Sequence, residues 1–262
     1  MPCENCSCKG CSASLGTKLA LDLKVYSYSN LIGKIDLDRN CMILYISGRN
    51  SGKSFSIQNL VYEMMKHKDY DAIYCFSETA RLSSVDTSYG FVPKEFIFRN
   101  NEILQVMEQI IYVQKLRAEQ KKAALSILVI FDDIEIEKNS GLDALAVRGR
   151  HFGLTVVLSS QKASTLISST IRSNFDYLFW REINETDVKD YIQPMLTKTH
   201  YNKKETEILT KDNLDSDYNF IFYNNVGKRK DGGNILHVLA KKVKFTFKIK
   251  SFTANAIKQN HE

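Results

Sequence analysis

Eight consecutive residues after a short apolar run have the composition of a phosphate-binding loop. They are Ser47, Gly48, Arg49, Asn50, Ser51, Gly52, Lys53 and Ser54. The preceding run, residues 41–46, is apolar, as is typical of a strand covered on both faces. After the loop, apolar side chains recur every three or four positions, which predicts a helix. Because backbone N–H groups between a strand and a helix N-terminus form a concavity that binds anions, this context predicts a P-loop.

Two side chains of this loop have a direct chemical role in the prediction. Lys53 is expected to reach the β- and γ-phosphates of ATP, and the hydroxyl of Ser54 to bind Mg²⁺. The usual pattern begins with Gly, but this chain has Ser47 there and Gly48 one place later. Since Gly48 still supplies a permissive backbone, the departure affects the expected shape of the loop more than its identity.

Two consecutive carboxylates, Asp132 and Asp133, follow the apolar run 127–131. A carboxylate at the end of a buried strand is costly unless a cation or hydrogen bonds compensate it. We therefore predict that Asp132 holds Mg²⁺, largely through water, and that Asp133 polarises the attacking water as general base. The alternative is a turn or a helix cap, where Asp is common.

Strand-like and helix-like segments alternate through the middle of the chain. This alternation predicts an α/β fold with a mainly parallel sheet and helices on both faces. An extra strand and helix between the two motif-bearing strands favour the RecA-like P-loop NTPases with an additional catalytic acid over simple kinases and GTPases. The expected strands are 41–46, 72–76, 127–131, 155–158 and 177–180, and the expected helices include 57–65 and 101–120.

The strand at 155–158 ends at Ser159, Ser160 and Gln161. The carboxyl ends of parallel strands face the ligand crevice, so Gln161 is expected near the acidic pair, where its amide can orient water and sense hydrolysis. A capping or turn role is the alternative.

Three arginines, Arg148, Arg150 and Arg172, are candidate arginine fingers. Such a finger stabilises the charge of the transition state in phosphoryl transfer. For each of them, a surface or structural role is the alternative.

Four segments, in this order, resemble the FtsK/HerA superfamily: 47–54, 127–133, 148–161 and 171–176. More narrowly they resemble the poxvirus-like genome-packaging ATPases of large DNA viruses and virophages. The resemblance covers about residues 40–182. It implies a ring-forming motor that pumps double-stranded DNA into a capsid and binds ATP at its subunit interfaces. The motor would be located in the virion or the host cytoplasm. The resemblance also implies that Lys53, Ser54, Asp132, Asp133 and Gln161 act in cis, and that Arg148, Arg150 or Arg172 acts in trans.

The charge balance is compatible with a DNA partner. The formal net charge is +6 and the isoelectric point is about 8.8. Lys228, Arg229 and Lys230 occupy a Gly-containing turn, and more lysines follow between 241 and 250. These residues would contact phosphates without reading sequence, so binding would weaken steeply with salt. A solvated strand face with an exposed loop is the alternative.

The ends of the chain differ from its middle. We expect a flexible tail at 1–16 and one ATPase domain at 17–262, with a motor core at about 40–182 and a basic extension at about 183–262. An edge strand or hairpin is expected within 17–40, and strands at 219–223 and 245–249. Helices are expected near 185–195 and 203–210.

Four cysteines lie in the tail: Cys3, Cys6, Cys8 and Cys11. Their thiolates form two CxxC pairs that suit zinc, but only Ser7 separates the pairs. Because four ligands from so short a segment would strain the backbone, a tail without zinc is the favoured reading. No apolar run is long enough for a membrane span, and none suggests a secretion signal, so a reducing cytosol is expected.

Two other classes of function remain open from the sequence. One is a different P-loop ATPase, helicase-like or of the AAA type, that acts on RNA or protein. The other is a scaffold that binds nucleotide without hydrolysing it.

Overall fold

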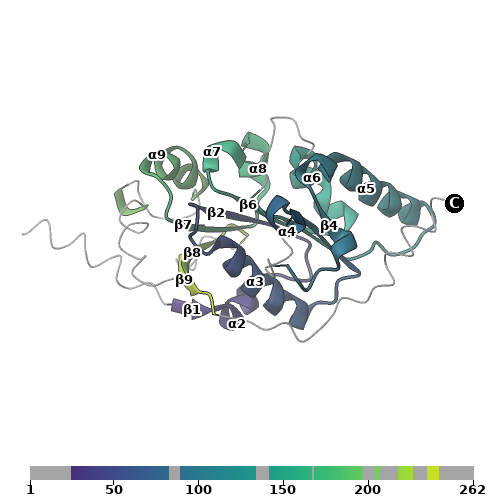
Figure 1. Ribbon diagram of the computed structural model, residues 1–262, viewed down its shortest axis with the longest axis horizontal. Coiled ribbons are helices and arrows are strands. Elements are labelled where there is room, and N and C mark those ends of the chain that lie inside the picture. Colours follow the sequence, from purple (N-terminus) through teal and green to yellow (C-terminus); the bar gives the residue numbers. More distant parts are fainter. Residues whose placement is uncertain are drawn as a thin grey trace, which may run out of the picture.

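A mostly parallel β-sheet forms the centre of the protein (Figure 1). The computed structural model describes residues 25–82, 89–133, 142–166, 168–196, 204–206, 218–226 and 235–241. Within these residues the sheet has nine strands, in the order β1-β9-β8-β7-β2-β6-β5-β3-β4. They are β1 (Val25–Ser27), β2 (Met42–Ser47), β3 (Ala72–Phe76), β4 (Ile97–Phe98), β5 (Ile127–Phe131), β6 (Leu154–Ser160), β7 (Tyr177–Arg181), β8 (Asn219–Asn224) and β9 (Ile235–Leu239).

The strand directions fit a RecA-like α/β fold. Pairings from β7 through β2 to β4 are all parallel, and β8 is antiparallel to both β7 and β9. Strand β6 lies between β2, which leads into the P-loop, and β5, which ends at the acidic pair. The predicted fold class, mainly parallel with helices on both faces, is therefore confirmed.

Helices connect the strands and cover both faces. They are α2 (Tyr28–Leu31), α3 (Lys53–His67), α4 (Glu78–Leu82), α5 (Ile103–Glu119), α6 (Leu142–Arg148), α7 (Ala163–Leu166), α8 (Ser169–Asn174), α9 (Glu185–Asp187) and α10 (Gln193–Met195). Short 3₁₀ turns are η2 (Ile32–Lys34), η3 (Lys94–Phe96), η4 (Asn100–Glu102) and η5 (Gly149–Phe152), and a π-helical turn, η6 (Val188–Ile192), joins α9 to α10.

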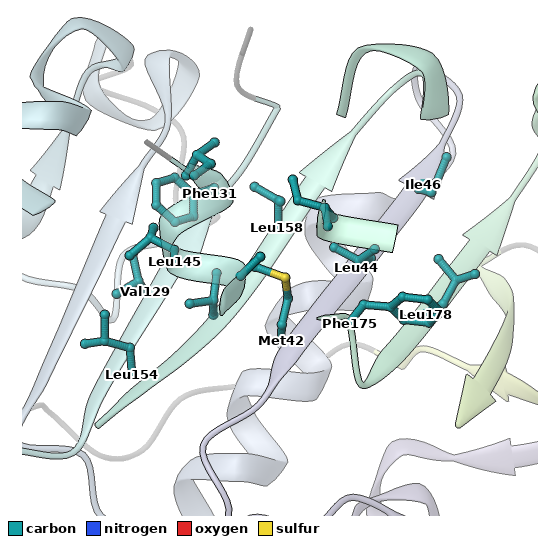
Figure 2. Close-up of a cluster of buried hydrophobic side chains, with 14 of the residues drawn as sticks. Met42, Leu44, Ile46, Val129, Phe131, Leu145, Leu154, Leu158, Phe175 and Leu178 are labelled. Atoms are coloured by element: carbon teal, nitrogen blue, oxygen red, sulfur yellow. The ribbon is translucent and has the colours of Figure 1, made fainter. Parts of the chain in front are cut away.

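Alternate side chains of β2 enter two separate cores. Met42, Leu44 and Ile46 belong to the cluster that contains side chains of α5, α6 and α8. Figure 2 shows these three side chains together with Leu145 of α6 in the same cluster. Ile43 and Tyr45 belong to the opposite cluster, with side chains of α2 and α3. Because successive side chains of a strand point to opposite faces, a continuous apolar run such as β2 is stable only when both faces are covered.

Gln114, near the end of α5, sets the starting points of β5 and β6. Its buried amide donates to the carbonyl oxygens of Leu125 (2.8 Å) and Phe152 (2.7 Å) and accepts from the N–H of Leu125 (3.0 Å). Gly153 follows with φ of 71°, and a Cβ there would lie 2.3 Å from the Leu125 carbonyl oxygen. Glycine at 153 therefore permits the close approach that brings the two strands into register.

All five strands expected in the middle of the chain are present, as are the helices expected at 57–65, 101–120 and 185–195. The region 17–40 contains the edge strand that was one of its two expected forms, β1, and then a helical stretch at 28–34 that was not expected. There the Ser27 hydroxyl accepts the N–H of Asn30 (3.3 Å), which caps α2 and ends the short edge strand β1.

The sheet also continues beyond residues 40–182. Strand β8 agrees with the strand expected at 219–223, whereas β4 and β9 had no counterpart in the sequence analysis. Residues 204–206 of the expected helix at 203–210 are helical. The tail at 1–16 and the strand at 245–249 lie outside the described residues.

Candidate active site

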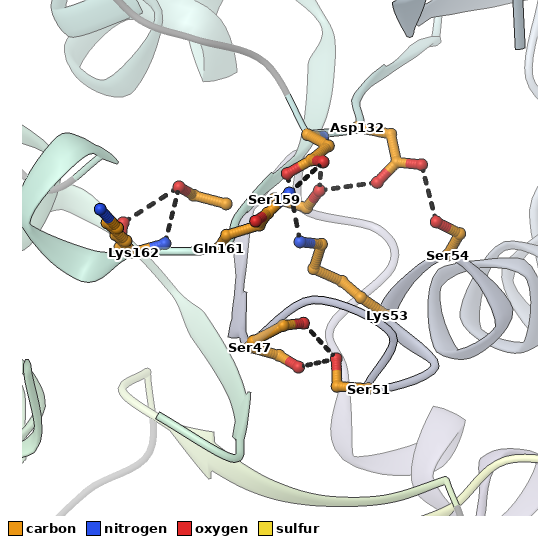
Figure 3. Close-up of polar contacts among 11 residues, drawn as sticks. Ser47, Ser51, Lys53, Ser54, Asp132, Ser159, Gln161 and Lys162 are labelled. Carbon is orange, nitrogen blue, oxygen red and sulfur yellow. Dashed lines mark hydrogen bonds and ion pairs between the residues drawn. The ribbon is translucent and has the colours of Figure 1, made fainter. Parts of the chain in front are cut away.

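The P-loop connects the end of β2 to the start of α3, and Ser47 is part of its internal bonding (Figure 3). The buried Ser47 hydroxyl donates to the hydroxyl of Ser51, which donates in turn to the carbonyl oxygen of Gly48 (2.8 Å). The N–H of Gly48 donates to the carbonyl oxygen of Glu182 (3.3 Å). A Cβ at Gly48 would lie 2.9 Å from that oxygen. Serine at the first position is thus compatible with the loop conformation. The close backbone approach that requires glycine occurs one residue later, between Gly48 and the carbonyl oxygen of Glu182.

Two residues of the loop have left-handed backbone conformations. Asn50 has φ of 59° and Gly52 has φ of 83°. Gly52 precedes α3, whose first turn includes Lys53 and Ser54, so the N-terminus of the helix opens towards the loop. The ring of Tyr218 lies against Gly52 on the other side and packs on Phe55, with centroids 4.9 Å apart. Arg49 is exposed.

Gly52→Ala should lower both stability and nucleotide affinity. An Ala in the left-handed region costs about 1–2 kcal/mol, and its Cβ would lie 2.3 Å from Cδ1 of Tyr218. Thermal unfolding and titration with an ATP analogue would measure the two effects. Gly33→Ala is the matched control, because nothing lies within 4 Å of a Cβ at that position. An unchanged melting temperature in the Gly52 variant would show that the loop relaxes freely.

Asp132, at the end of β5, is buried and is held by two hydroxyl groups. Ser54 donates to one carboxylate oxygen (2.9 Å), and Ser159 of β6 donates to the other (2.8 Å). Hydroxyl and carboxylate oxygens are hard ligands of the kind that Mg²⁺ prefers. Ser54 and Asp132 therefore fit the magnesium site expected from the sequence.

Asp133 is the meeting point of three segments. Lys53 of the P-loop places its Nζ 3.4 Å from Oδ1, and Gln161 donates from Nε2 to Oδ2 (2.5 Å). The backbone N–H of Asp133 donates to the Ser159 hydroxyl (3.0 Å). The side chain of Asp133 is 44% exposed and that of Lys53 only 8%, so the carboxylate is accessible to solvent while the lysine is buried. A solvent-facing carboxylate beside a lysine and an amide can polarise a water molecule.

None of the candidate arginines lies at the P-loop of its own chain. Arg150 donates to a carboxylate oxygen of Asp176 (2.7 Å) and to the carbonyl oxygen of Asn174 (2.8 Å). Arg148 is exposed at the end of α6, and Arg172 lies over the ring of Tyr191 at 5.8 Å. All three belong to segments that lead into the amino ends of β6 or β7, whereas the P-loop follows the carboxyl end of β2. Because these strands are parallel, the arginines lie towards the amino ends of the strands and the P-loop lies at their carboxyl ends.

The sequence analysis missed several residues at the site. Ser159 bonds to both carboxylate-bearing residues, Glu182 accepts from Gly48, and Tyr218 packs on Gly52. Tyr89 is a further one, because its buried hydroxyl interacts with Asp132 and Ser54. The position of Ser159 at the carboxyl end of a strand could have indicated that it belongs to the site. The other residues have no local sequence pattern that would have identified them.

Three solved structures show what the fold resembles. The pCW3 conjugation coupling protein TcpA, monomer form with ATPγS, matches with a TM-score of 0.53 at 14% identity, over 87% of this chain and 67% of TcpA. The genome-packaging NTPase B204 from Sulfolobus turreted icosahedral virus 2, with ATPγS, matches with a TM-score of 0.51 at 15% identity, over 78% of this chain and 98% of B204. ATPases 2 and 3 of EssC from Geobacillus thermodenitrificans match with a TM-score of 0.53 at 13% identity, over 85% of this chain and 43% of that one.

The structural neighbours are P-loop ATPases of the FtsK/HerA type. At these identities the likeness concerns the fold, which is that of a RecA-like P-loop NTPase. By sequence, no protein-family model and no curated protein matches the chain.

Two other expectations concern metal and membrane. Among the described residues, no group of three or more His, Cys, Asp or Glu side chains could hold a metal ion. The zinc candidates Cys3, Cys6, Cys8 and Cys11 lie outside those residues. In the part of the chain that the structure describes, no helix has both the length and the apolar character needed to cross a membrane.

Proposed function

We propose that this chain hydrolyses MgATP and uses the energy to move double-stranded DNA, as the genome-packaging motor of a virus. The observation that best supports hydrolysis is that Lys53 and Gln161 both contact the carboxylate of Asp133. The three residues come from the P-loop, the end of β5 and the end of β6. Two motif residues and an amide that converge from separate strands make a site for a phosphate chain and an attacking water.

In the proposed reaction, each residue has one task. Lys53 leaves Asp133 for the β- and γ-phosphates, and Asp133 then accepts a proton from the attacking water. The water oxygen bonds to the γ-phosphorus as the bond from that phosphorus to the β–γ bridging oxygen breaks, which yields ADP and phosphate. Gln161, bonded to Asp133, orients the water. Ser54 and Asp132 would hold Mg²⁺, which would supply positive charge to the phosphate oxygens.

The packaging role has support of a different kind. The match to B204, a genome-packaging NTPase, covers 98% of B204 and 78% of this chain, which supports a packaging role. The net charge of +6 suits a polyanion. Lys228, Arg229 and Lys230, proposed for phosphate contact, lie outside the described residues.

A ring of identical subunits would complete the site. In a head-to-tail ring, each subunit presents a different surface to each of its two neighbours. Arg148, Arg150 and Arg172, distant from the P-loop of their own chain, are in this proposal available to the site of the next subunit. Capsid proteins are the expected docking partners, in the virion or in viral factories of the host cytoplasm.

The decisive experiment is steady-state ATP hydrolysis with and without long double-stranded DNA. We expect DNA to stimulate turnover, the stimulation to fall steeply as salt rises, and Lys53→Ala to abolish turnover under both conditions. Turnover that ignores DNA would instead favour an ATPase that acts on RNA or protein. No turnover with tight nucleotide binding would favour a scaffold.

A further inference from the structure

Tyr89 is buried beside the proposed magnesium site, and its side chain has no role in the reaction proposed above. It precedes β4 in a turn closed by a hydrogen bond from the N–H of Val92 to its carbonyl oxygen (2.9 Å). Its ring is 2% exposed, packs near Phe91 with centroids 6.1 Å apart, and belongs to the core on the α3 face of the sheet. The ring is therefore fixed in place by packing, and the position of its hydroxyl oxygen is fixed with it.

The hydroxyl of Tyr89 makes no regular hydrogen bond within the described residues, although it interacts with both Asp132 and Ser54. A phenol with an ordinary pKa of about 10 keeps its proton at physiological pH. It is a neutral donor close to the two residues that fit Mg²⁺.

A buried hydroxyl without a partner destabilises the fold, because the hydrogen bonds that it makes with water in the unfolded chain are not replaced. Buried donors of this kind are uncommon, and a functional role is one of the accepted reasons for them. Here each carboxylate oxygen of Asp132 accepts one hydroxyl, from Ser54 or Ser159, and a carboxylate oxygen can accept more than one hydrogen bond. Asp132 therefore has acceptor capacity for Tyr89.

We propose that Tyr89 is a positioning residue for the magnesium site, with a hydroxyl that donates to Asp132 when the ion is bound. This inference rests on the proposed function, since it concerns the same site. Outer partners that orient a metal ligand typically change metal affinity by 10- to 100-fold. The effect of Tyr89 should therefore appear in the magnesium dependence of nucleotide binding.

The test is a magnesium titration of the full-length chain with a fluorescent, non-hydrolysable ATP analogue. Tyr89→Phe removes only the hydroxyl and keeps the packed ring. We expect it to raise the Mg²⁺ concentration at half-saturation by about 10- to 100-fold. Binding without Mg²⁺ should be unchanged, and the melting temperature should be unchanged or higher.

Tyr74→Phe is the matched control. Tyr74 of β3 is also buried with a hydroxyl that has no partner among the described residues, but it lies in the core on the opposite face. Its variant should keep the wild-type magnesium dependence. A wild-type titration curve for Tyr89→Phe, beside magnesium-dependent binding by the wild type, would overturn the role of Tyr89 alone. A wild type whose nucleotide binding ignores Mg²⁺ would overturn both this inference and the proposed hydrolysis.

Discussion

Asp133→Asn should slow steady-state ATP hydrolysis by about 10²–10⁴-fold, the usual contribution of a general base. The amide has the size of the carboxylate and can still accept from Gln161, but it cannot take the proton of the attacking water. The backbone of residue 133 has φ of 53°, a region that Asn adopts as readily as Asp. A loss of rate would therefore report the lost base rather than a distorted turn.

The same substitution should leave nucleotide binding at least as tight as in the wild type. Lys53 now pairs with Asp133 at 3.4 Å, and without that charge it is freer to bind phosphate. Phosphate release gives the rate, and titration with a non-hydrolysable ATP analogue gives the affinity. Asp190→Asn, the same change at an exposed position of η6, should alter neither. Hydrolysis by the Asp133 variant within a few-fold of the wild-type rate would remove Asp133 as the base.

Arg150→Ala should lower the free energy of unfolding by about 3 kcal/mol, as expected when one partner of a buried ion pair is removed. Asp176 is 4% exposed and would keep only the N–H of Met42 (2.8 Å) among the donors seen here. We place the loss at the lower end of the usual range because Arg150 itself is 29% exposed. Arg148→Ala, at an exposed position, should cost less than about 0.5 kcal/mol.

The loss should also depend on pH. Burial already raises the pKa of Asp176, and removal of Arg150 would raise it further. As pH falls towards that raised pKa, the native variant gains a proton that the unfolded chain still lacks, so its stability recovers relative to the wild type. Urea unfolding at about pH 5 and pH 8 would measure this. A similar loss at both pH values, or for Arg148→Ala, would contradict the ion pair as the cause. Arg150→Lys, if folded, then separates a role in hydrolysis from the structural one.

The strands at 41–180 and the main site residues were predictable because each has a local signal. The run 41–46 and the triplet Gly52, Lys53 and Ser54 mark a P-loop together, and parallel strands bring their carboxyl ends to one edge. That rule correctly placed Gln161 against Asp133. Ser47 fits the first loop position through its bond to Ser51, which the sequence alone did not reveal.

Other features depend on partners that are distant in sequence. Tyr89 reaches Asp132 and Ser54 only through the folding of the chain around β3, and a lone tyrosine carries no periodic pattern. The ion pair of Arg150 with Asp176 likewise depends on the adjacent amino ends of β6, β2 and β7. Strand β9 pairs with β1 from the other end of the chain, and local propensity did not identify it.

The central position of β2 determines when this fold can form during synthesis. Its two neighbours, β6 and β7, are made long after it, and the carbonyl oxygen that holds Gly48 belongs to Glu182. At about 5–20 residues per second, a ribosome needs roughly 7–27 s to proceed from Ser47 to Arg181. During that time the apolar strand lacks both partners and is exposed to aggregation or to chaperones. The P-loop therefore reaches the geometry described above only after Glu182 has been made, because the Gly48 N–H depends on that carbonyl oxygen.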